Sequence, residues 1–162
     1  MKPDTVGRHD GSTAARPQMH IPGLWAKGIL LTAVGERRVG DLLPGDRIIT
    51  RDRGMVTLRG LTRRRLRMPV VRVKAGSLGH SRPERDALLP VSQRILLRDW
   101  RARALFDRDQ ALVAVSRLVD GEFVTHEGTV TLELCDLDLG GPHILYLDGL
   151  EVASQTTGAL AA

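Results

Sequence analysis

Residues 30–50 read Leu-Leu-Thr-Ala-Val-Gly-Glu-Arg-Arg-Val-Gly-Asp-Leu-Leu-Pro-Gly-Asp-Arg-Ile-Ile-Thr. The apolar runs at the two ends of this stretch have the length of β-strands. Gly35 can take positive φ between them, and Pro44-Gly45 is typical of a type II turn, because proline presets φ and glycine supplies φ > 0. Leu42 and Leu43 indicate a buried corner. The stretch therefore predicts short strands joined by tight turns.

The same pattern continues along the chain. Turn residues separate runs of strand length at intervals of roughly eight to twelve residues. We expect an all-β, mostly-β domain of about ten short strands, arranged as a sandwich or a partly closed barrel with little helix. Its clearest later strands are predicted over residues 55–59, 70–74, 94–98, 130–135 and 143–147. Residues 102–106 are predicted as a further strand, and residues 111–119 as a buried strand followed by a single helical turn.

A chain of 162 residues has the size of one domain. Residues 1–22 are polar, with Pro17 and Pro22, and cannot bury enough apolar surface to offset the entropy of ordering, so we expect a flexible N-terminal leader. The domain is predicted over residues 23–154. Residues 155–162 are small or polar and are expected to fray.

Hydrophobic residues make up 42% of the chain but aromatic residues only 3%, so the core must be aliphatic. The net charge is +5, and the 24 basic residues include only three lysines. This arginine excess has two interpretations, the codon usage of a GC-rich bacterial genome or an arginine-specific binding role; the even spread of arginines favours the first. No apolar stretch approaches the ~20 residues that span a bilayer, and Asp4 and Asp10 interrupt any signal-peptide core. We expect a cytoplasmic protein without membrane contact, with secretion by a non-classical route left open.

Cys135 is the single cysteine, which excludes an intrachain disulfide and a cysteine-based zinc site. Its apolar surroundings predict a buried small hydrophobe and not a reactive thiol. The histidines lack the spacing of ligands on one helix, and we expect neither a metal nor a cofactor. Two metal-binding arrangements stay open. In one, His143 would lie close to Asp136 and Asp138, and in the other His126 would act with Glu127.

The quoted stretch resembles the opening of bacterial Hint (hedgehog/intein) domains. That family opens with a strand ending in Thr, a Gly turn, a return strand, Asp-Leu, a Gly-Asp pair, and a strand ending in Thr before an Asp. The matching residues here are Thr32, Gly35, Asp41, Leu42, Gly45, Asp46, Thr50 and Asp52. Weaker blocks follow in the family's order at residues 70–79, 86–97, 118–121 and 147–149, so that the resemblance covers most of residues 24–154.

The resemblance implies a self-catalysed acyl shift, in which a Cys or Ser at the first position of the domain attacks the preceding carbonyl. A His acts as general acid and base, and intein-type members finish with a terminal Asn. Here the register places Gly23 at the nucleophile position and Gln93 at the position of the His, and the chain contains no Asn. Gln can donate a hydrogen bond but cannot carry a proton near neutral pH. His143 lies near the family's late His-containing block and is a candidate relic of the site.

Three functions stay open. The first is a degenerate Hint domain without self-cleavage, not an enzyme, that serves as a structural or interaction module for other protein segments. The second is an active self-cleaving domain with an unrecognised nucleophile. The third is a basic β domain that binds nucleic acid through the run Arg63-Arg-Arg-Leu-Arg67. The scarcity of stacking aromatics and the 19 interspersed acidic residues argue against the third. The pattern does not set the oligomeric state.

Overall fold

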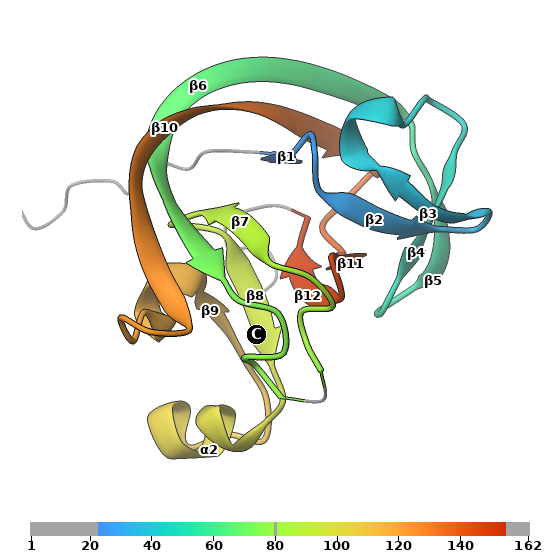
Figure 1. Cartoon of the computed structure of the whole chain (residues 1–162). Coiled ribbons are helices and arrows are strands. Elements are labelled where there is room, and N and C mark those ends of the chain that lie inside the picture. Colours follow the sequence, from blue (N-terminus) through green and yellow to red (C-terminus); the bar gives the residue numbers. More distant parts are fainter. Residues whose placement is uncertain (1–22, 80, 155–162) are drawn as a thin grey trace, which may run out of the picture.

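A computed structural model describes residues 23–79 and 81–154 (Figure 1), so the leader and the tail predicted for residues 1–22 and 155–162 lie outside the described residues. The described part is mostly β, as predicted. Its strands are β1 Leu24–Trp25, β2 Ile29–Thr32, β3 Gly35–Arg38, β4 Arg47–Thr50, β5 Gly54–Thr57, β6 Gly60–Val73, β7 Ala87–Pro90, β8 Arg94–Leu97, β9 Ala111–Ala114, β10 Val124–Asp138, β11 Ile144–Leu147 and β12 Leu150–Ala153. Its helical elements are the 3₁₀ turns η2 Val39–Asp41 and η3 Val115–Leu118 and the α-helix α2 Trp100–Phe106.

The strands form two antiparallel sheets. One has the order β1-β10-β6-β7, and the other has the order β3-β2-β4-β11-β12-β8-β9, with β5 paired to β4 and an additional β2–β11 pairing. The hairpin β11–β12 lies in the middle of the larger sheet. In Figure 1, β6 and β10 form a long curved ribbon that arches over the other strands. These two strands hold 14 and 15 residues, so the expectation of uniformly short strands was wrong for them.

The basic run Arg63–Arg67 lies within this long ribbon, on its edge: among the described strands β10 pairs with it on one side, while β7 pairs only with Val70–Val73 of β6. Strand pairing continues through it without a break, with Arg65 opposite Glu133 and Leu66 opposite Leu132. Opposite charges and apolar pairs that face each other across an antiparallel ladder stabilise it. A register shift between His126 and Thr129 bends the ribbon instead.

Residues 102–106 belong to α2 and not to a strand, so that prediction was wrong. Asp99 caps the N-terminus of α2, where its carboxylate accepts a hydrogen bond of 3.0 Å from the backbone N–H of Arg101. Asp107 ends the helix in the left-handed region, with a φ of 55°. Caps on both sides of a run rich in Ala, Arg and Leu favour helix over strand. The strand and single helical turn predicted for residues 111–119 are present as β9 and η3.

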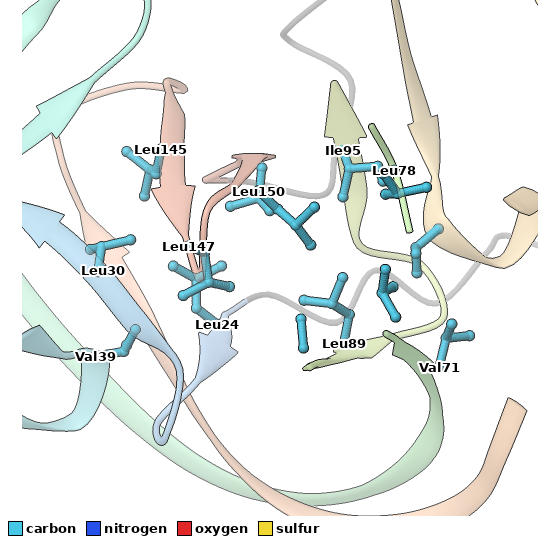
Figure 2. Close-up of a cluster of buried hydrophobic side chains, with 14 of the residues drawn as sticks. Leu24, Leu30, Val39, Val71, Leu78, Leu89, Ile95, Leu145, Leu147 and Leu150 are labelled. Atoms are coloured by element: carbon cyan, nitrogen blue, oxygen red, sulfur yellow. The ribbon is translucent and has the colours of Figure 1, made fainter. Parts of the chain in front are cut away.

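The main core lies between the two sheets and is aliphatic. Figure 2 shows leucines of β1, β2, β11 and β12 gathered around the centre of the larger sheet. Leu42 is buried in this core at the end of η2, but Leu43 is 61% exposed, so only half of the predicted corner is buried. The reason is that Leu43 already belongs to the following turn, where its N–H donates to the carboxylate of Asp46.

A second, smaller apolar cluster lies on the other face of the β6–β10 ribbon and contains Met68, Val70, Leu132 and Leu134. Neighbouring residues Val71 and Cys135 point to the main core, which is the alternation that the sequence predicted for residues 130–135. None of the helices in the described part of the chain has the length and hydrophobicity needed to span a bilayer.

Candidate functional site

Gly23 lies immediately before β1. The resemblance to Hint domains places the nucleophile at this position. β1 pairs with β10, with Leu24 opposite Cys135 and Trp25 opposite Leu134. Gly23 has a φ of +118°, a conformation that L side chains rarely adopt. A Cβ added there would lie 3.1 Å from the carbonyl oxygen of Cys135 and 3.1 Å from the Cβ of Leu134. The backbone therefore leaves little room for a side chain at this position.

Gln93 lies in the turn between β7 and β8 and is 1% exposed. Its side-chain Nε2 donates hydrogen bonds to the carbonyl oxygens of Ala153, at 2.9 Å, and Arg94, at 3.0 Å. Its own backbone carbonyl accepts a hydrogen bond of 2.8 Å from the N–H of Val115. Both amide protons are thus engaged with backbone oxygens, and Gln93 joins the start of β8 to the end of β12.

His143 lies just before β11 and is paired with an acidic residue that the sequence did not single out for this role. Its Nδ1 lies 2.9 Å from Oδ2 of Asp52, while Oδ1 of Asp52 accepts a hydrogen bond of 2.9 Å from the N–H of Ile144. Burial alone would raise the pKa of Asp52, but the hydrogen bonds from Ile144 and His143 outweigh it, so that this pKa lies below its usual value. The carboxylate fixes the orientation of the imidazole ring, as in an Asp–His dyad.

Ser154 brings the end of β12 next to His143. The Ser154 Oγ accepts a hydrogen bond of 2.9 Å from the backbone N–H of His143, and the Ser154 N–H donates one of 2.9 Å to the carbonyl of His143. Since Gln93 holds the preceding residue, Ala153, the structure brings Gln93 and His143 to adjacent positions of one strand end. Gly23 contacts β10 instead. Sequence reasoning missed Ser154, whose only signal is its position at the end of the last apolar run.

Cys135 lies one strand away from Gly23, directly opposite Leu24. The thiol is fully buried, and burial raises its pKa above the usual value although Arg63 partly opposes this effect. The Nη1 of Arg63 lies 4.0 Å from its Sγ. This is the environment of the buried small hydrophobe predicted from the sequence and not of an activated thiolate.

The residues considered as metal ligands interact with other partners in the structure. His143 pairs with Asp52 and not with Asp136 or Asp138, and Glu127 forms a 3.3 Å ion pair with Arg72. Across residues 23–79 and 81–154, no group of three or more His, Cys, Asp or Glu side chains is placed to hold a metal ion.

The basic run is exposed on β6, where Arg63 donates to the carbonyl of Gly40. The most exposed aromatic side chain, Trp100, lies on α2, a different element, and its ring is 4.8 Å from the guanidinium carbon of Arg101. The basic run and this most exposed aromatic side chain therefore do not share one strand face, as arginines and aromatics do in a single-stranded nucleic-acid groove.

Comparison with known proteins agrees with the resemblance to Hint domains. A model of the Hint domain family matches residues 22–159. The crystal structure of MchDnaB-1 intein is similar with a TM-score of 0.51 and 14% identity, covering 80% of this chain and 98% of the intein. The crystal structure of gp41-1 intein is similar with a TM-score of 0.52 and 10% identity, covering 80% and 96%. At these identities the likeness concerns the fold alone. A search of curated proteins found no match.

Proposed function

The chain belongs to the Hint domain family, whose model matches residues 22–159, and from this premise we propose that it has lost self-processing and serves as a structural or interaction module. Acyl-shift chemistry needs a nucleophile, a group that moves a proton, and donors that stabilise the oxyanion. The observation that carries the proposal concerns the first of these. At position 23 there is no side chain, and a Cβ would meet the backbone of Cys135.

The chain also lacks, at the position where the resemblance places it, a side chain that can move a proton. Gln93 stands where the family has its central His, and its amide cannot exchange a proton near neutral pH. Its buried contacts with Ala153 and Arg94 are those of a residue that joins two strands. This supports the view that the position now serves the stability of the domain.

Cys135 is a poor replacement for the missing nucleophile. It is the chain's single thiol, it is fully buried, and its raised pKa disfavours the thiolate that attack on a carbonyl requires. The side chain also points to the main core, among aliphatic neighbours.

Intact mass spectrometry tests the proposal. The full chain is incubated with a thiol or with hydroxylamine, each of which would intercept a thioester or ester. We expect the full mass to persist. A fragment that ends at or near Pro22 would refute the proposal, and the variants Cys135→Ala and His143→Ala would then show which side chain the cleavage needs.

One observation favours a second function, retained self-cleavage at the Ala153–Ser154 bond. The carbonyl oxygen of Ala153 already accepts a hydrogen bond from Gln93, which could stabilise an oxyanion there. The Ser154 Oγ lies beside the His143–Asp52 pair. In this reaction Oγ would bond to the Ala153 carbonyl carbon, the C–N bond would break, and the nitrogen would take the hydroxyl proton, leaving an ester that water hydrolyses.

The same mass spectra separate the two functions, because cleavage at this bond produces a fragment of residues 1–153. Ser154→Ala would abolish that fragment under the second function. Persistence of the full mass in hydroxylamine contradicts the second function and supports the first.

A further inference from the structure

Glu151 of β12 is a buried carboxylate surrounded by three arginines from separate segments. Arg98, after β8, holds it through two hydrogen bonds, Nε to Oε1 at 2.7 Å and Nη2 to Oε2 at 3.2 Å. Arg82, from the loop before β7, places Nη1 3.3 Å from Oε1, and Arg51, after β4, places Nε 3.5 Å from Oε2. The Glu151 side chain is 2% exposed, while each of the arginines keeps about one third of its side-chain surface in solvent.

The charges of this cluster do not balance. One carboxylate faces three guanidinium groups, which can never lose their protons in a protein. Arg82 and Arg51 lie within ion-pair distance of Glu151, but, within the described residues, neither guanidinium makes a side-chain hydrogen bond. Their planar forks of N–H donors therefore remain available to a further anion. One arginine is enough to pair with Glu151, so the other two give the cluster a net positive charge.

A cavity of about 50 Å³ opens beside the cluster. It exceeds the roughly 30 Å³ that one water molecule occupies in the liquid, and because it is open to solvent, a ligand of several heavy atoms extends out of it. Arg82, Arg98 and Glu151 line it, together with Asp99, whose carboxylate is engaged by Arg101. Four leucines also line it: Leu78, Leu96, Leu97 and Leu150. The cavity thus combines guanidinium groups with apolar residues.

We propose that this cavity binds a small aliphatic carboxylate, with its carboxylate on Arg82 and on the Nη1 of Arg98, which the pair with Glu151 does not use, and its aliphatic group against the leucines. Two guanidinium groups suit the two oxygens of a carboxylate. A phosphate carries polar oxygens on every side and would leave some of them against the leucines without a partner. The same chemistry is offered by a free short-chain acid and by the C-terminal residue of a peptide. The inference is independent of whether the domain cleaves itself.

The test is a titration of the ¹⁵N-labelled full chain, followed by NMR at constant ionic strength. Sodium isobutyrate is the probe, with isopropylamine as a ligand of the same shape and opposite charge and inorganic phosphate as a competing oxyanion. We expect saturable shifts of the amides of Arg82, Arg98 and Leu150 with isobutyrate. A short peptide with a free C-terminal carboxylate, compared with its amide, shows which source of carboxylate the site prefers. Shifts that stay linear, or that phosphate produces equally well, overturn the proposal.

Variants locate the site. Arg82→Gln should weaken isobutyrate binding about tenfold, the effect of one charge-assisted hydrogen bond. Arg64→Gln, on exposed β6, makes the same change of net charge and should leave binding unchanged. If Arg82→Gln does not fold, Arg82→Lys keeps the charge, removes the fork, and should also weaken binding. An equal loss in Arg64→Gln, or no loss in the Arg82 variants, overturns the assignment.

Discussion

The side-chain amide of Gln93 donates a buried hydrogen bond of 2.9 Å to the carbonyl oxygen of Ala153. This single contact ties the turn before β8 to the end of β12 and fixes the strand end that also carries Ser154 and faces His143. The residue that the resemblance places at the family's proton-transfer position is part of the hydrogen-bonded framework. Its replacement should therefore change stability.

Gln93→Leu removes the donor of two hydrogen bonds and leaves the buried carbonyl of Ala153 without its partner. We expect it to lower the free energy of unfolding by about 1–3 kcal/mol. Urea denaturation followed by circular dichroism measures the change. Gln110→Leu, at an exposed position, is the matched control and should have little effect. Equal stability of the two variants would show that the Gln93 contacts contribute nothing.

Gly23→Ala should destabilise the domain by about 1–3 kcal/mol, because it combines an unfavourable φ with close contacts to β10. Gly35→Ala separates the two effects, since Gly35 has a similar φ of +109° but open space around its Cβ position. The loss in urea denaturation should be larger at position 23 than at position 35. The same strain should prevent Gly23→Cys combined with Gln93→His from restoring thiol-dependent cleavage.

Asp52→Asn removes the charge that pairs with His143 and should cost about 1 kcal/mol at neutral pH. The folded-state pKa of Asp52 is lowered, so its contribution is fully present above the usual aspartate value of 3.8 and is lost as pH falls toward the folded-state value. The stability difference between wild type and variant should therefore shrink in acid. Unfolding curves measured across this pH range check it, with Asp109→Asn at an exposed position as control. A difference that grows in acid would contradict this assignment.

Arg85→Gln should destabilise the domain more at neutral than at mildly acidic pH. Burial raises the pKa of Asp148, while the 3.0 Å hydrogen bond from Arg85 opposes that shift. A raised carboxyl pKa means that stability is greatest while Asp148 is protonated and is lost as pH rises through the folded-state pKa. Without Arg85 this loss increases, by about 1–2 kcal/mol after allowance for the solvent exposure of the arginine. Arg53→Gln, an exposed arginine, should show no such pH dependence.

Cys135 should react slowly with iodoacetamide in the folded protein and quickly in urea, since its thiol is buried and its pKa is raised. Mass spectrometry over time measures the labelled fraction. Rapid labelling of the folded chain would show that β1 opens readily and would reopen the question of Cys135 as a nucleophile.

Periodicity and turn chemistry predicted most of the strands, because a strand such as β11 is short, apolar and bounded by turn residues. The same reasoning failed at α2, where the capping carboxylate of Asp99 and the left-handed backbone of Asp107 favour helix over strand. It also predicted only the end of β6 as a strand, at residues 70–74, because the charged run before them lacks the apolar alternation of a strand; in the structure Arg65 lies opposite Glu133 of β10.

The candidate site was predictable only in part. The register proposed Gln93 and His143 as candidates, and the structure places them near one strand end, but their hydrogen-bond partners come from residues far away in sequence. Asp52 lies 91 positions from His143 along the chain, and no local pattern reports such a pairing. Glu151 was hidden for a similar reason, because a single acidic residue between apolar neighbours does not show which arginines will surround it.

The long β6–β10 ribbon also has a kinetic consequence. Its ladder places Gly60 opposite Asp138 and Val73 opposite Val124, so that pairing can begin only after a large loop has closed. Chains dominated by such non-local contacts fold slowly, in milliseconds to seconds in small domains. Until the ribbon forms, β1 has no partner strand. We therefore expect β1 to be among the last strands of the domain to become ordered as the chain folds.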